Sequence, residues 1–146
     1  MSGQADTPEV VRAQRFEVVD ARGRTRVALD VDVAMGTPGL TLDDEQGKMR
    51  AMLSLLPDGT PDLVLCDEKG KTRATLGLAR DGEPAVTFFD DKGKERAMLS
   101  VGSDGSPGLG LSDENRATRA MLSLLADGTP FLGFADKKGK VMWQAP

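Results

Sequence analysis

The stretch RAMLSLLPDGTP, residues 50–61, decides the fold because it returns as RAMLSLLADGTP at residues 119–130. The two copies lie three periods of 23 residues apart, and prolines at 38, 61, 84, 107 and 130 mark every period. Self-similarity at such a short, fixed interval is typical of an array of supersecondary units that stack on one another. The sequence therefore predicts a repeat protein.

Each unit reads Pro-x-Leu-x-Leu-x-Asp-x-x-Gly-Lys-x-Arg-Ala-x-Leu-x-Leu-x-x-Asp-Gly-x, and the units begin at residues 38, 61, 84, 107 and 130. A divergent copy begins at residue 14 and has one extra residue before Pro38. In the last copy, Met142 and Trp143 replace the arginine and the alanine. We expect one repeat domain over 14–146 with end copies that act as caps, and a flexible lead-in over 1–13 in which EVVRA could add a short strand.

Within each unit the apolar residues alternate with small or polar ones, as in Leu40 and Leu42 or Ala51, Leu53 and Leu55. A period of two, interrupted by Gly-containing turns every 11 or 12 residues, indicates short half-buried strands. The predicted fold class is therefore all-β: six tandem β-hairpins of about 23 residues. They form an elongated antiparallel meander of about 12 strands, roughly 55 Å across at about 4.8 Å per strand.

The turns fix the register of the hairpins. LPDGT, residues 56–60, predicts a three-residue loop with a type I turn and a Gly bulge, which places Leu53 opposite Leu63. The turn DEQGK, residues 44–48, needs either a four-residue loop or an added bulge to place Leu40 opposite Leu53. Either solution lets no stagger accumulate, so the pattern favours an open sheet over a closed barrel.

One face of the predicted sheet is apolar, and an open sheet cannot leave such a face in water. We expect it to form the core of a homo-oligomer: a trimer with three sheets around a prism-like core first, and a dimeric sandwich second. A β-trefoil and a propeller-like monomer rank lower. The residues of this predicted oligomer core are Leu40, Leu42, Leu53, Leu55, Leu63, Leu65, Leu76, Leu78, Leu99, Leu109, Leu111, Leu122, Leu124 and Trp143.

The opposite face carries arginine, methionine and serine at repeating positions and is a candidate interaction face. We expect its arginines to pair with polar or acidic neighbours such as Asp43, and the alternative is a ladder for a repetitive anionic ligand. The residues of this face are Arg50, Met52, Arg73, Arg96, Met98, Arg119 and Met121.

Composition excludes several functions. Histidine is absent, and with it the Ser-His, Cys-His and His-metal arrangements that work near neutral pH. The net charge of -4 and the aromatic content of 4% disfavour nucleic-acid binding. Acidic clusters such as Asp43-Asp44-Glu45 and Asp90-Asp91 fit turn capping better than calcium binding. We predict no catalytic residue, no metal, no cofactor and no enzymatic activity.

Targeting signals are also missing from the sequence. There is no apolar run long enough for a membrane span, and the first ten residues lack the features of a secretory signal. The single cysteine, Cys66, cannot form an internal disulfide, and a small half-buried strand residue is its expected role. These features together predict a cytoplasmic protein.

The repeat unit is similar to that of uncharacterised bacterial tandem β-hairpin repeat proteins, whose units read DxxGKxRAxLxLxxDGxP and whose chains end in GKVxWxAP. The end of this chain, GKVMWQAP at residues 139–146, resembles that ending. The resemblance covers nearly the whole chain and implies no activity, ligand or site residue. The membrane occupation and recognition nexus repeat has a similar period, but its Tyr- and Trp-rich strand pattern is missing here.

The function predicted from these features is a non-enzymatic structural or assembly scaffold that self-associates through its Leu/Ala face. The alternative is a binding module that uses the Arg/Met/Ser face or the acidic turn edges to hold a repetitive polymer or a protein partner.

Overall fold

The protein is described by a computed structural model that covers residues 10–31, 36–79 and 81–145, and these ranges contain strands and turns but no helix. The part of the predicted lead-in at residues 1–9 lies outside the described residues. Residues 10–14 form no strand. The strands are β1 (Arg15–Val19), β2 (Thr25–Val31), β3 (Pro38–Asp43), β4 (Met49–Leu55), β5 (Pro61–Cys66), β6 (Thr72–Leu78), β7 (Pro84–Phe89), β8 (Glu95–Val101), β9 (Pro107–Ser112), β10 (Thr118–Leu124), β11 (Pro130–Ala135) and β12 (Val141–Ala145).

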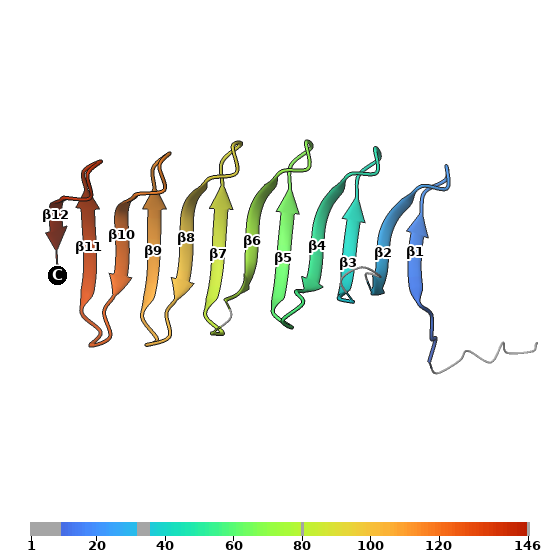
Figure 1. Ribbon diagram of the computed structural model, residues 1–146, viewed down its shortest axis with the longest axis horizontal. Coiled ribbons are helices and arrows are strands. Elements are labelled where there is room, and N and C mark those ends of the chain that lie inside the picture. Colours follow the sequence, from blue (N-terminus) through green and yellow to red (C-terminus); the bar gives the residue numbers. More distant parts are fainter. Residues whose placement is uncertain (1–9, 32–35, 80, 146) are drawn as a thin grey trace, which may run out of the picture.

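All twelve strands belong to one sheet and follow one another in chain order, each antiparallel to its neighbours. The result is a ribbon of hairpins whose first and last strands lie at opposite ends of the long axis (Figure 1). The predicted all-β meander of tandem hairpins is thereby confirmed. The edges stay open because the pairing pattern is the same in every repeat and adds no stagger.

Turns of two kinds alternate along the ribbon. The turns along the lower edge in Figure 1 are called DG turns, because four of them contain an Asp-Gly pair, at residues 58–59, 81–82, 104–105 and 127–128. In one of them Leu56 N donates to Thr60 O at 2.8 Å, and Gly59 has a φ of 85°. The loop therefore has three residues and ends in the predicted Gly bulge. Leu53 pairs with Leu63 as predicted.

The GK turns, along the upper edge in Figure 1, follow the aspartates at 20, 44, 67, 90, 113 and 136. They too are three-residue loops, since Asp44 N donates to Lys48 O at 2.9 Å. The register is restored by a β-bulge beside Asp43, in which Arg50 is the extra residue, so that Leu42 pairs with Ala51. Of the two solutions left open by the sequence, the bulge is the one used.

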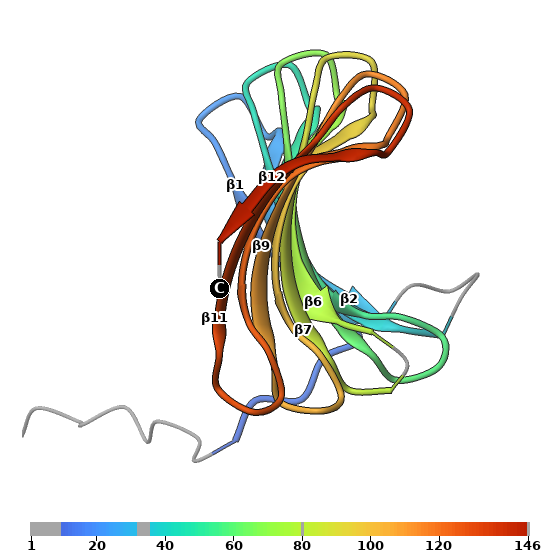
Figure 2. The ribbon, with the colours of Figure 1, turned by 90° about the vertical axis from the view of Figure 1, so that its left-hand side faces the viewer.

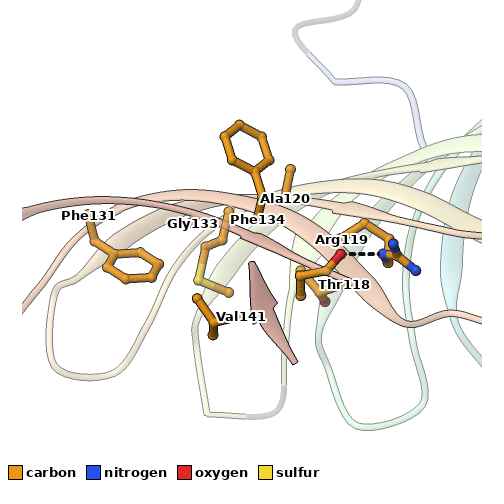
Figure 3. A pocket seen from close by; sticks show the side chains of 9 residues that line it. Thr118, Arg119, Ala120, Phe131, Gly133, Phe134 and Val141 are labelled. Atoms are coloured by element: carbon orange, nitrogen blue, oxygen red, sulfur yellow. Dashed lines mark hydrogen bonds between the residues drawn. The ribbon is translucent and has the colours of Figure 1, made fainter. Parts of the chain in front are cut away.

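The sheet is a single layer that is bent across its strands, so that both turn edges curve toward the same side (Figure 2). Phe134 and Ala120 project from the outer, convex side, whereas Phe131 and Val141 lie on the inner, concave side (Figure 3). Phe134 pairs with Ala120, and alternate strand residues share a face. The leucines therefore cover the convex side, called the leucine face, and the concave side is called the arginine face.

The layer has almost no interior of its own. Four of the described residues are buried, namely Ala28, Cys66, Thr87 and Gly133. Ala28, Thr87 and Gly133 lie on the crowded concave side, where small residues allow the strands to bend. The leucines form no core within the described chain.

Candidate interaction surfaces

The leucine face consists of rows of side chains that run straight across the strands. The central row is unbroken because residues directly opposite in neighbouring strands share a face. It contains Phe16, Leu29, Leu40, Leu53, Leu63, Leu76, Val86, Leu99, Leu109, Leu122, Leu132 and Ala145.

Most of this face lies open to solvent. Leu53, Leu99 and Leu122 are each about half exposed, at 52%, 52% and 53%. Trp143, at the end of the ribbon, is 50% exposed although its ring packs beside Phe134 at 5.7 Å between centroids. All the residues predicted to form an oligomer core lie on this side. Together with the other large apolar residues of this face, roughly twenty side chains present on the order of 1,000 Å² of apolar surface, at about 100 Å² for a whole leucine.

The arginines of the opposite face are held by their own chain. Arg50 Nε donates to the carbonyl oxygen of Cys66 at 3.1 Å, and Arg50 Nη1 lies 3.5 Å from Asp44 Oδ2. The prediction of neighbouring polar partners is correct, but naming Asp43 as the carboxylate was wrong. The side chain of Asp44 pairs with Arg50, whereas Asp43 offers its backbone oxygen to Arg26 at 2.9 Å. The bulge turns the arginine toward its own turn and toward the end of the next strand.

The same arrangement recurs along the ribbon. Arg73, Arg96 and Arg119 donate from Nε to the carbonyls of Phe89, Ser112 and Ala135 at 3.0, 2.8 and 2.7 Å. Their Nη1 atoms lie 3.4 to 3.5 Å from the aspartates of their own GK turns. Each arginine therefore connects one hairpin to the next.

Lysines in the GK turns make a second set of connections, which sequence reasoning missed. Lys48 Nζ donates to Glu68 O at 2.9 Å, across to the next GK turn. Lys71 and Lys94 repeat this bond with Asp91 O and Glu114 O, both at 2.6 Å, and Arg24 donates to Glu45 O in the first repeat. The recurrence of lysine after glycine was a visible signal, but its acceptor is a backbone atom 20 residues away.

The aspartates of the GK turns act as caps. Asp44 Oδ1 accepts the amides of Gln46 and Lys48 at 2.9 and 3.0 Å, and these bonds, led by that from Lys48, lower the pKa of its carboxyl. The pKa of Asp20 falls to about 2, mainly through its hydrogen bond with the Arg24 side chain. Capping is thus the role of these acidic residues in the structure. Within the described ranges, no three acidic or cysteine side chains gather as a metal site would require.

Asp62 shows the opposite behaviour because it lies within a strand. It occupies the arginine face of β5 opposite Gly77, where partial burial raises the pKa of its carboxyl. A Cβ at position 77 would lie 2.8 Å from Asp62 Oδ1, so the glycine makes room for the carboxyl.

The fifth GK turn departs from the repeat. Arg116 takes the position of the usual glycine and has a φ of 65°, and Ala117 takes the position of the lysine. Asp113 still accepts the amides of Asn115 and Ala117, so the turn keeps its shape. The turn lacks the lysine that would donate to the sixth hairpin. Of the arginine and lysine bonds that connect successive hairpins, only the bond from Arg119 to Ala135 O is therefore described between the fifth and sixth hairpins.

The methionines of the arginine face lie on the concave side of the sheet, and Met98 and Met121 are 36% and 42% exposed. Near the last hairpin, Met121, Phe131, Gly133 and Val141 help to line a pocket of about 210 Å³ (Figure 3). A Cβ at position 133 would lie 2.7 Å from the Phe131 ring, so glycine is needed for the ring to lie there. No acidic side chain or cysteine lines this pocket.

No family model matches this sequence, and a comparison with curated proteins finds no match. Among the described residues there is no helix that could cross a membrane.

Proposed function

We propose that the protein is a structural or assembly scaffold whose copies associate through the leucine face. The observation that carries the proposal is a twelve-stranded sheet one layer thick, in which most leucines of the leucine face are 36–53% exposed and four of the described residues are buried. A sheet of this kind needs a second apolar layer to be stable in water.

The size of the exposed face supports association between copies. About 1,000 Å² of apolar surface exceeds the 300–600 Å² that is ordinary for the largest patch on a monomer, and it exceeds the ~800 Å² per partner of a standard interface. A second copy supplies a surface of the same length and spacing, which another partner would need to match over twelve strands.

The arginine face is the less favoured interaction surface. Its arginines already donate to carbonyls and pair with turn aspartates, so a polymer ligand would have to compete with these bonds.

The repeating sheet itself supplies a rigid spacer without any reactive side chain.

The test is light scattering on a sizing column, where self-association gives a defined multiple of 15.5 kDa. Leu99→Lys with Leu122→Lys places two charges in the central row, and we expect the multiple to be lost. The control, Met98→Lys with Met121→Lys, puts the same charges one residue away on the same two strands, and should leave the assembly intact. A monomeric wild-type chain, or equal effects of both pairs, would refute the proposal.

A further inference from the structure

The leucine face has two outer rows, one on each side of the central row. The GK-side row lies between the central row and the GK turns, and the DG-side row lies next to the DG turns. Both rows run straight across the sheet because their residues are paired directly opposite one another.

The two outer rows alternate in size, and they do so in opposite phase. On odd strands the GK-side residue is large and the DG-side residue is proline, as with Leu42 and Pro38 on β3. On even strands the GK-side residue is alanine and the DG-side residue is large, as with Ala51 and Leu55 on β4. The GK-side row from β3 to β11 is Leu42, Ala51, Leu65, Ala74, Phe88, Ala97, Leu111, Ala120 and Phe134. The DG-side row is Pro38, Leu55, Pro61, Leu78, Pro84, Val101, Pro107, Leu124 and Pro130.

This alternation makes the two rows complementary to each other. When the GK-side row of one copy faces the DG-side row of another at the same level, every strand from β3 to β11 places a large residue against a smaller one. Rotation about an axis parallel to the long axis of the sheet produces this match, because such a rotation leaves each strand at its own level. Apolar surfaces that interdigitate in this way reach the density of protein interiors.

The bend of the sheet decides how many copies meet. The leucine face is convex, with both turn edges curving away from it (Figure 2). Two convex faces touch along their central rows only, and their outer rows separate. Three copies leave no such gap, because the half of the sheet that carries the GK-side row can lie against the half that carries the DG-side row of the next copy around the axis.

We propose that three copies associate back to back around an axis parallel to the ribbon, with the GK-side row of each copy packed into the DG-side row of its neighbour. This rests on the proposed self-association through the leucine face. The central rows meet near the axis, and the three arginine faces point outward as open troughs. The pattern is broken at the ends, where Val27 on β2 and Trp143 on β12 fill the alanine position.

The test changes the alternation on three even strands. Ala51→Leu, Ala97→Leu and Ala120→Leu fill the small positions on β4, β8 and β10 and should make large residues collide across the interface. Adding Leu55→Ala, Val101→Ala and Leu124→Ala exchanges large and small residues and restores the match. The control, Met52→Leu, Met98→Leu and Met121→Leu, puts the same three leucines on the same strands on the arginine face.

Light scattering over a dilution series gives the readout, with circular dichroism to confirm that each variant keeps its strands. The wild-type chain and the control should give three times 15.5 kDa. The filled variant should dissociate at a concentration at least about tenfold higher, and the exchanged variant should return to within about threefold of wild type.

The possible failures are distinct. A monomeric wild-type chain would overturn the proposed function and this inference together. A stable dimer or another multiple would overturn the three-copy arrangement while self-association stands. A trimer in which filling has no effect, or in which the exchange restores nothing, would overturn the row-into-row packing.

Discussion

The two turn edges of the sheet share one backbone design but differ in how they connect the repeats. On both edges, the turns whose closing hydrogen bonds are described are three-residue loops that end in a residue with positive φ, which is glycine except at Arg116. Along the GK edge, arginines and lysines reach from each hairpin to carbonyls of the next. Along the DG edge, a bond of another kind occurs, in which Ser103 N donates to Glu83 Oε1 at 2.6 Å.

The difference shows that loop shape and repeat cohesion are separate tasks in this fold. The loop needs an aspartate that caps its amides and a glycine that closes it, and both edges have these. Cohesion between hairpins needs long cationic side chains that can span a strand-to-strand distance, and these are concentrated at the GK edge. The bulge beside each GK turn makes this possible because it aims the arginine at the next strand.

Low pH should have the largest effect on the stability of the protein, because it protonates the capping aspartates of several turns at once. The folded-state pKa is lowered for the aspartates of the first five GK turns, to about 2 for Asp20, relative to about 3.8. Their stabilisation is therefore present above about pH 4 and is lost as the pH falls from there toward 2. Urea unfolding at fixed protein concentration should give a midpoint that falls steeply over this range.

Substituting one aspartate at each edge distinguishes the contributions of the GK turns and the DG turns in the same urea-unfolding experiment. Asp90 accepts two amides and pairs with Arg96, whereas Asp127 accepts the amide of Thr129. Asp90→Asn should lower the midpoint at pH 7 and flatten the acid dependence more than Asp127→Asn does. Equal effects of the two substitutions would mean that the edges are not distinguished by their aspartates.

Removing two arginine connections should have the next largest effect. Arg73→Gln with Arg96→Gln removes two Nε bonds to carbonyls and two contacts with turn aspartates. The loss should be about 2 kcal/mol of unfolding free energy, at about 1 kcal/mol for each half-exposed connection. The control at the other edge is Glu83→Gln, which weakens the bond to Ser103 N and should cost only a few tenths of a kcal/mol. A loss at the DG edge as large as that at the GK edge would contradict the comparison.

The smallest effect is expected at the fifth GK turn. Arg116→Gly places glycine where φ is 65° and should raise the free energy of unfolding by about 0.5–1 kcal/mol, because a side chain with a Cβ is strained there. The matched change Gly93→Arg, at a φ of 73° in the preceding GK turn, should lower it by a similar amount. Urea midpoints that move in the same direction for both variants would show that this turn is not strained.

Much of the fold could be read from the residues. The 23-residue period, the alternation of apolar residues and the position of glycine in each turn are local properties, and they predict strands, loops and faces directly. Leu53 opposite Leu63 followed from loop length and parity alone. The bulge at Arg50 was one of two solutions, with a four-residue loop as the other, that place Leu40 opposite Leu53. Only the three-dimensional structure distinguishes them.

The candidate site was predicted less completely than the fold. Every residue predicted for the oligomer core lies on the leucine face, because the apolar residues alternate regularly along each strand. The partner of Arg50 was misassigned, since the sequence does not reveal that a bulge aims this side chain at Asp44 and at the carbonyl of Cys66. Backbone acceptors such as Glu68 O cannot be predicted from the sequence, because every residue has a carbonyl oxygen that could accept the bond.

What the sequence by itself determined is the repeating hairpin and its two unlike faces, since both follow from a strand period of two and a loop of fixed length. The tertiary structure decided that the sheet is one layer, that it bends away from its leucines, and that lysines and arginines join the hairpins along the GK edge. These features depend on the summed curvature of bulged strands and on atoms 16 to 20 residues apart along the chain. Such distances are set only when neighbouring strands are already in place.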